Sequence, residues 1–360
     1  MVVSFLRSLP RLGRRWTPFS FSNPNFIRLP TGQAIEEETI PGYVAGRYYP
    51  TRIGEILKDR YQVVGKLGFG ASSTVWLARD MEYHSYVTLK LFIKSTSMGQ
   101  QLDDELNIYK RIEGASQKHP GRKYVRSLLD SFDVNGPEDK HRCLVHPPLW
   151  ESVLSFLFRD FEENELQSPC PRKELDGRTI YTSRELGIPN QPCAPILCDF
   201  GSAVLGDEEH SEDIQPDIYR APEVILEIPW TYSVDIWNVG CMVWNLFEGG
   251  SLFSGQDPEF QTYRSRAHLA EMIRLLGPPP PSFLARGNLT QKFFSEEGDF
   301  CAGVSVGEYT PLEQRETSLE GEDKEKFLRL VRKMLQWEPE RRSSAKELEK
   351  DEWLQTELNK

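Results

Sequence analysis

The chain has 360 residues, of which 39% are hydrophobic and 11% aromatic, and its formal net charge at pH 7 is −11. This length is sufficient for two lobes with their own cores, and the composition is that of an ordinary globular protein. The acidic balance disfavours direct binding of nucleic acid and suits basic protein partners, although it would equally serve solubility alone.

The sequence also argues against a membrane protein and a zinc protein. No apolar run approaches the length needed to span a membrane. The six cysteines form no Cys-x-x-Cys pair, so we expect reduced thiols and no structural zinc.

The first 35 residues are basic, with five arginines and no acidic residue. Apolar residues at loosely helical spacing match a mitochondrial transit peptide; they are Phe5, Leu6, Leu9, Leu12 and Trp16. Prolines at 10, 18, 24 and 30 break any long helix and favour a disordered basic tail instead. Both interpretations of residues 1–35 remain open, and residues 36–60 lead into the first long strand.

Residues 61–67 form a β-branched, alternating run that leads into a glycine turn and a second strand. Gly68 and Gly70 would let backbone N–H groups approach nucleotide phosphates without a Cβ in the way. An ordinary turn is the alternative for such a glycine pair. The candidate nucleotide contacts are Leu67, Gly68, Phe69, Gly70 and Val75.

A further strand at 87–90 places Lys90 one strand pair beyond this turn, where its ammonium could hold α and β phosphates. The apolar residues between 102 and 112 recur at helical spacing, and Glu105 lies on this predicted helix. Glu105 is therefore a candidate partner for Lys90. A solvated strand-edge lysine and a solvated helix-face glutamate are the alternatives.

Residues 195–198 are predicted to form a short buried strand that ends at Asp199-Phe200-Gly201. This position would suit a carboxylate that binds Mg²⁺. The tripeptide alone is common by chance. Its sequel is more specific, because Ala221-Pro222-Glu223 follows about two dozen residues later. An apolar helix begins at 233, further helices are predicted at 267–276 and 324–336, and residues 277–282 form a proline-rich loop.

In their order and spacing these motifs resemble those of a eukaryotic protein kinase over roughly residues 55–356. The SR protein kinase branch is the closest resemblance, on segments 47–54, 141–145, 214–219 and 248–253. The resemblance implies an α+β, two-lobed fold, with an antiparallel N-lobe and hinge at 61–149 and a mainly helical C-lobe at 150–356. It implies ATP and Mg²⁺ as cofactors and Ser/Thr phosphorylation of Arg/Ser-rich splicing proteins. It also implies a cytoplasmic and nuclear location, with the mitochondrion as the alternative.

Residue by residue, the resemblance makes Lys90 the phosphate lysine, Glu105 its ion-pair partner and Asp199 the Mg²⁺ ligand. It pairs Glu223 with Arg342 near the C-terminus. The adenine site would follow His146, where the Pro147 carbonyl can accept a hydrogen bond from adenine and the Leu149 N–H can donate one. Basic substrates would meet the acidic residues of the activation segment, which are Glu208, Glu209, Glu212 and Asp213.

The resemblance has one large gap, because the family's catalytic loop should precede Asp199 and is missing. That loop carries His-Arg-Asp and, five residues after its aspartate, an asparagine. Asp160 follows an arginine, but Glu165 stands where the asparagine is needed. No catalytic residue is therefore identified, and the polar, proline-rich insert at 161–194 is expected to be exposed.

This gap leaves Asp199 and Asp235 without their family partners, and a buried, unpaired Asp235 would be costly. We therefore expect an incomplete C-lobe, impaired catalysis and an omitted exon. The alternative is a non-catalytic pseudokinase that binds nucleotide or serves as a docking protein.

Overall fold

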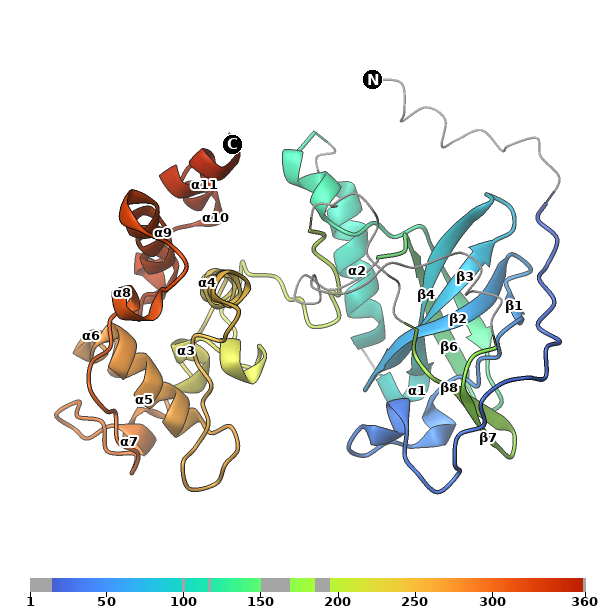
Figure 1. Ribbon diagram of the computed structural model, residues 1–360, viewed down its shortest axis with the longest axis horizontal. Coiled ribbons are helices and arrows are strands. Elements are labelled where there is room, and N and C mark those ends of the chain that lie inside the picture. Colours follow the sequence, from blue (N-terminus) through green and yellow to red (C-terminus); the bar gives the residue numbers. More distant parts are fainter. Residues whose placement is uncertain (1–14, 99–100, 116–117, 150–168, 185–194, 359–360) are drawn as a thin grey trace. The chain divides into compact units, whose positions relative to one another are not determined.

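The computed structural model describes residues 15–98, 101–115, 118–149, 169–184 and 195–358 (Figure 1). The chain separates into two compact units, Met1–Val204 and Leu205–Lys360. The first is built on an antiparallel sheet and the second is mainly helical, as the predicted α+β class requires.

The first unit is organised around a six-stranded sheet with the order β1-β2-β3-β4-β6-β5, in which every pair is antiparallel. Its strands are β1 (Ile56–Leu57), β2 (Tyr61–Gly70), β3 (Ser73–Asp80), β4 (Ser85–Lys94), β5 (Asp130–Asn135) and β6 (Lys140–His146). Alternate residues such as Val63, Trp76 and Leu89 form the core of one face, as the period of two in a strand dictates.

Helix α2 (Gln101–Gly114) follows the short α1 (Ser95–Met98) and lies beside the sheet (Figure 1). Its Leu106 and Tyr109 are buried against Phe92 of β4 and Leu144 of β6. This packing fixes the side of α2 that carries Glu105, one residue before Leu106. The predicted helix is therefore confirmed.

A second, two-stranded sheet lies within the segment expected to be an exposed insert. It consists of β7 (Arg172–Leu175) and β8 (Arg178–Tyr181). Cys170 and Tyr181 are buried in the core of the first unit, and the Tyr181 ring meets the Trp76 ring edge-on at 5.9 Å. The prediction of an exposed insert is therefore wrong for Cys170, Lys173, Ile180 and Tyr181, which are buried, whereas residues 174–177 at the tip of the hairpin are exposed as predicted.

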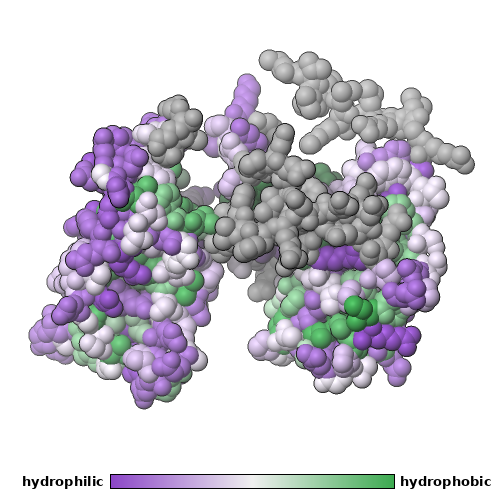
Figure 2. Space-filling model, in the orientation of Figure 1, coloured by the Kyte–Doolittle hydropathy of each residue, from purple (hydrophilic) through white to green (hydrophobic). Residues whose placement is uncertain are grey.

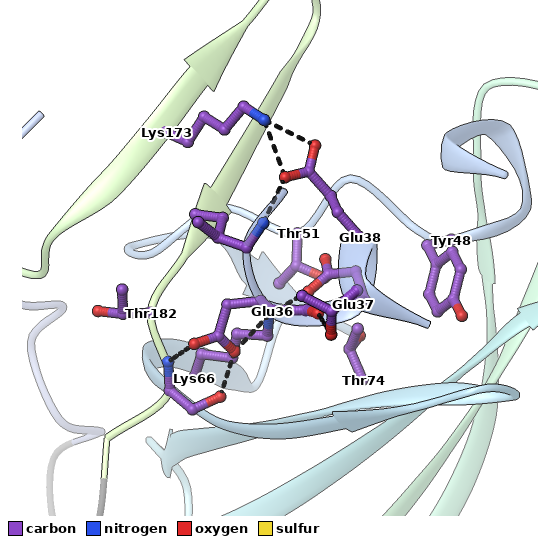
Figure 3. A network of polar contacts seen from close by, with 12 residues as sticks. Glu36, Glu37, Glu38, Tyr48, Thr51, Lys66, Thr74, Lys173 and Thr182 are labelled. Atoms are coloured by element: carbon purple, nitrogen blue, oxygen red, sulfur yellow. Dashed lines mark hydrogen bonds and ion pairs between the residues drawn. The ribbon is translucent and has the colours of Figure 1, made fainter. Parts of the chain in front are cut away.

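Acidic residues before the first strand hold this hairpin in place (Figure 3). The 3-10 helix η2 (Glu36–Thr39) carries three consecutive glutamates. Lys173 of β7 donates to both carboxylate oxygens of Glu38, at 3.0 and 2.9 Å, and the Ser183 N–H donates to Glu36 at 2.8 Å. Lys66 of β2 is fully buried between Glu36, at 3.2 Å, and Glu37. The network thus joins three distant segments of the sequence.

The described part of the basic N-terminal segment packs on the sheet and contains no α-helix. Phe19 and Phe21 contact buried Val64 and Leu77. The guanidinium of Arg79 lies 3.4 Å from the centroid of the Phe19 ring. The described residues of this unit also form two further 3-10 helices, η3 (Ala45–Arg47) and η4 (Pro120–Tyr124).

The second unit is a cluster of helices whose core contains Trp237, Trp244, Phe253 and Phe327. Its α-helices are α3 (Pro222–Ile225), α4 (Ser233–Glu248), α5 (Ser265–Leu276), α6 (Pro281–Leu284), α7 (Thr290–Phe293), α8 (Leu312–Arg315), α9 (Gly321–Met334), α10 (Ala345–Leu348) and α11 (Glu352–Leu358). Two 3-10 helices, η7 (Asp217–Tyr219) and η8 (Pro339–Arg341), accompany them.

Helices α4, α5 and α9 confirm the helices predicted from apolar periodicity. On the face shown in Figure 2, the unit that carries the C-terminus presents mostly hydrophilic and intermediate residues, with hydrophobic ones in smaller groups. Among the described residues, no helix combines the length and the apolar character that crossing a bilayer would require.

Candidate functional site

The first unit contains a cavity of about 530 Å³ beside the β2–β3 turn. Among the predicted nucleotide contacts, those that line it are Phe69, Gly70, Val75, Lys90, Glu105 and Asp199. Leu67 and Gly68 lie on the same strand as Phe69 and Gly70 but do not line the cavity. The turn, the strand lysine and the helix glutamate are therefore brought together as the sequence predicted.

Lys90 forms the centre of the site, because two carboxylates from distant segments bind its ammonium. Its Nζ donates to Glu105 Oε1 at 3.0 Å and Oε2 at 2.8 Å, and to Asp199 Oδ1 at 2.9 Å. The Glu105 side chain is 1% exposed, whereas that of Asp199 is 76% exposed. Glu105 is thus the fixed partner of Lys90, and Asp199 is the partner that faces solvent.

The two carboxylates differ in pKa because their surroundings differ. Burial raises the pKa of Glu105 above its usual range, although the positive charge of Lys90 opposes this effect. For Asp199, partial desolvation by neighbouring groups acts to raise the pKa, but the charge and hydrogen bond of Lys90 and a hydrogen bond from the Gly201 backbone outweigh it, so its pKa lies below its usual range. Asp199 is therefore ionised at neutral pH and suited to bind a cation.

Backbone conformation at 199–201 contributes to this arrangement. Asp199 has φ of 64°, in the left-handed region that a non-glycine residue rarely adopts. A Cβ on Gly201 would lie 3.2 Å from Glu105 Oε2, so glycine allows Glu105 to approach closely. The Phe200 ring packs edge-on against Tyr109 of α2 at 5.1 Å. The predicted buried strand before Asp199 is wrong, however, because Leu197 forms only a single bridge with Val125 and is 63% exposed.

The residues of this cavity fit the phosphates of a nucleotide. A Cβ placed on Gly68 or Gly70 would meet no heavy atom within 4 Å, so open space lies beside this part of the backbone. Arg126 adds a second cation to the cavity lining, and its buried Nε has no partner among the described residues. A single carboxylate, Asp199, is also sufficient for Mg²⁺ when phosphate oxygens supply further ligands.

Arg126 was not predicted as a site residue, and no local motif marks it. It also affects the predicted adenine site, because its Nη2 donates to the Pro147 carbonyl at 3.2 Å. Neither Pro147 nor Leu149 lines the cavity, so their contact with adenine stays a prediction. His146 is buried, its Nδ1 lies 3.0 Å from the Ser127 carbonyl oxygen, and burial lowers its pKa to about 3.

The segment where a catalytic loop was sought lies mostly outside the described residues, and this includes Asp160 and Glu165. In the second unit, Arg342 donates to both oxygens of Glu223, at 2.5 and 2.7 Å, which confirms the predicted ion pair. Asp235 of α4 is exposed within this unit and has no side-chain hydrogen bond to a described residue. Asp235 is therefore less buried than expected, although partial desolvation by its surroundings still raises the pKa of its carboxyl.

Comparisons with known proteins agree with this geometry. The family model described as the protein kinase domain matches residues 191–354. A serine/threonine protein kinase of Aspergillus fumigatus is 39% identical, with 97% of this chain and 97% of the relative covered. The serine/threonine-protein kinase SRPK of Physarum polycephalum is 28% identical over 87% of this chain and 90% of the relative. The dual specificity protein kinase CLK2 of Mus musculus is 28% identical over 81% of this chain and 63% of the relative.

The chain belongs to the eukaryotic protein kinase family, in the branch that includes the SRPK and CLK kinases. Its β-rich and helical units correspond to the two lobes of that fold. A kinase-like function of the serine/threonine class follows from this membership.

Proposed function

We propose that this chain is an ATP-binding, kinase-like protein with impaired phosphoryl transfer, from a family that phosphorylates Ser/Thr in Arg/Ser-rich proteins. The observation that carries the proposal is the position of Lys90 between buried Glu105 and exposed Asp199 in the cavity beside the glycine turn. Three charged groups from a strand, a helix and a loop meet there, as nucleotide binding in this family requires.

Five residues of the cavity have a definite task in this proposal. Glu105 holds the ammonium of Lys90 in place, and Lys90 and Arg126 bind the negative phosphates. Asp199 would hold Mg²⁺, which when bound neutralises charge on the β and γ phosphate oxygens. The Gly70 backbone leaves room for the phosphates at the tip of the β2–β3 turn.

Impaired transfer follows from the residues that the sequence lacks. Without an aspartate to accept the substrate proton and an asparagine for a second Mg²⁺, only positioning and charge stabilisation remain. The alignment with the Aspergillus relative extends over 394 positions, more than the 360 residues of this chain. That relative therefore contains residues without a counterpart here, which supports an omitted segment.

Nucleotide binding is tested by thermal unfolding with and without ATP and Mg²⁺. A ligand that binds only the folded state at a hundred times its dissociation constant adds about 2.7 kcal/mol of stability. Lys90→Ala should abolish the rise in Tm. Lys94→Ala is the matched control, because Lys94 lies on the same strand but pairs with Glu138 outside the cavity. An unchanged Tm in the parent protein would refute nucleotide binding.

Phosphoryl transfer is tested with labelled ATP and an Arg-Ser peptide. We expect no measurable transfer by the chain of this sequence, and full activity would contradict the proposed impairment. A transcript that contains an additional exon between the codons for Phe158 and Glu165 would support the omitted segment. A transcript that reads straight through would contradict the omission.

The second candidate is a pseudokinase that binds basic proteins without modifying them. It is favoured by an exposed acidic loop in the second unit, formed by Glu208, Glu209, Glu212 and Asp213. Opposite charge attracts a basic peptide to such a loop and speeds encounter. Replacement of Glu208 and Glu209 by glutamine should weaken binding of an Arg-Ser peptide, most clearly at low salt. Unchanged affinity would show that this acidic loop is not the binding site for the peptide.

A further inference from the structure

The second unit contains a separate cavity of about 290 Å³, which the proposed nucleotide site does not use. It lies between the end of α5, the loop that follows α4, and the segment that leads into and includes α8. Its lining residues are Ser251, Leu252, Ser254, Glu271, Arg274, Leu275, Thr310 and Arg315. Two arginines in one small cavity are notable in a chain whose net charge is −11.

The single carboxylate in this lining is already satisfied by other groups. Glu271 accepts hydrogen bonds from the Ser254 N–H at 2.7 Å, the Ser254 hydroxyl at 2.6 Å and the Gly255 N–H at 2.9 Å. Among the described residues, no carboxylate oxygen lies within 4.0 Å of the Arg274 or Arg315 guanidinium. Glu271 thus fixes the loop and leaves both arginines without an ion-pair partner.

Neutral oxygens hold the two guanidinium groups in position. Arg315 Nη1 donates to the Leu252 carbonyl at 2.7 Å, and Arg274 Nε donates to the Thr310 hydroxyl at 3.2 Å. Each bond uses one of the five N–H donors of an arginine. Burial lowers the pKa of Arg315, the negative charge of nearby Glu271 opposes this effect, and the positive charge of Arg274 lowers the pKa further. The net shift is downward, so a bound anion would still stabilise the charged Arg315.

We propose that this cavity binds a phosphorylated serine or threonine side chain of a protein partner. The two arginine charges, which Glu271 offsets only in part, favour the charge of about −1.5 to −2 that a phosphomonoester carries near pH 7. Arginine also offers paired N–H groups that suit phosphate oxygens. The site goes beyond the proposed function, because none of its residues belongs to the nucleotide cavity.

Fluorescence anisotropy on the full chain tests this proposal with three labelled peptides of one neutral sequence. One contains phosphoserine, one serine and one glutamate at the central position. The phosphoserine peptide should bind about tenfold more tightly than the serine peptide, since charge-assisted hydrogen bonds are stronger than neutral ones. It should also bind more tightly than the glutamate peptide, because a phosphomonoester carries more negative charge and more acceptor oxygens than a carboxylate. Equal binding of all three peptides would overturn the proposal, and equal binding of the glutamate and phosphoserine peptides would overturn the assignment to phosphate.

Two variants and a matched control locate the binding. Arg274→Gln and Arg315→Gln should each reduce affinity for the phosphoserine peptide about tenfold. Arg264→Gln is the control, because Arg264 precedes α5, is exposed and lies outside the cavity lining. Arg274 is itself exposed, so Arg274→Gln remains informative if Arg315→Gln fails to fold. Unchanged affinity in Arg274→Gln, or an equal loss in Arg264→Gln, would refute the site.

Discussion

Each unit buries a cation completely, and the two units surround it differently. In the helical unit, Arg342 and Glu223 both have side chains with 0% exposure, and the arginine also donates to the Ser233 and Gln336 carbonyls. In the β-rich unit, Lys66 is equally buried, but it lies between Glu36 and Glu37 (Figure 3). The cation of the helical unit thus belongs to a single bidentate pair, whereas the cation of the β-rich unit belongs to a cluster.

The difference follows from the shape of the two cations. The guanidinium is a planar fork that one carboxylate can match with two parallel hydrogen bonds, whereas an ammonium is a point charge that accommodates several partners. Arg178 also binds Glu37, at 3.3 Å, so the cluster around Lys66 balances its charges among several residues. We therefore expect the helical unit to depend on one contact and the β-rich unit to tolerate partial loss.

The largest effect is expected for Arg342→Leu. Removal of one partner from a fully buried pair leaves the other charge uncompensated, which typically costs about 3–5 kcal/mol. Urea unfolding of the variant measures this loss. Arg341→Leu is the control, because the Arg341 side chain is 70% exposed and its pair with Glu338 should contribute no more than about 1 kcal/mol. Equal losses for the two variants would contradict the comparison.

Lys66→Met should cost less, about 1–3 kcal/mol, because Arg178 continues to neutralise Glu37. Adding Glu37→Gln to this variant should recover part of the loss, since it removes the buried charge that the first substitution leaves unpaired. A double-mutant cycle by urea unfolding measures the coupling. Strictly additive losses would show that the cluster does not act as a unit.

A pH titration compares the two units through one buried histidine in each. Burial lowers the pKa of both His146 and His268 to about 3. Both histidines are neutral in the folded protein, and in the unfolded chain they protonate near pH 6.5. Their contribution to the free energy of unfolding is therefore complete above pH 6.5 and is lost as the pH falls towards 3. The loss should approach about 1.4 kcal/mol per pH unit for each histidine.

Thermal unfolding between pH 6.5 and 5 measures this dependence before most carboxylates titrate. His268→Gln should reduce the slope for the helical unit, and His146→Gln should reduce it for the β-rich unit. Slopes identical to that of the parent protein would mean that these histidines do not cause the pH dependence.

The smallest loss of stability is expected at the exposed N-terminus of α10, which follows shortly after Arg342 of the buried Arg342–Glu223 pair. Ser344 accepts a hydrogen bond from the Glu347 N–H, and Glu347 in turn accepts one from the Ser344 N–H, which forms a capping box at α10. Ser344→Ala should cost about 1 kcal/mol, the usual value for a lost N-cap. Chemical denaturation checks this value, and a loss as large as that of Arg342→Leu would contradict the ranking.

The features that were predicted correctly from the sequence were those marked by a family motif or by apolar residues at a regular spacing. The Lys90–Glu105 and Glu223–Arg342 pairs follow from family motifs, and α4 and α5 follow from apolar residues at helical spacing. By contrast, no local pattern shows which lysine an acidic run such as residues 36–38 will bind, because those partners lie far away in sequence. Arg126 was missed for the same reason.

The β7–β8 hairpin did have a signal in the sequence. Asp176-Gly177 forms its two-residue loop, and Gly177 has φ of 77°. Asp-Gly is a typical hairpin loop, because glycine adopts positive φ at little cost. The polar composition around it led to the wrong prediction of exposure. What decided burial was the packing of Tyr181 against Trp76, which the sequence of the hairpin alone does not reveal.

The hairpin determines where the chain can be divided for separate expression. A recombinant fragment that ends at Leu149 would retain the glycine turn and Lys90 but would lose Tyr181 from its core and Lys173 as the partner of Glu38. A fragment that ends at Val204 retains both, together with Asp199. A fragment for nucleotide titration or crystallisation should therefore end at Val204 and not at the predicted hinge.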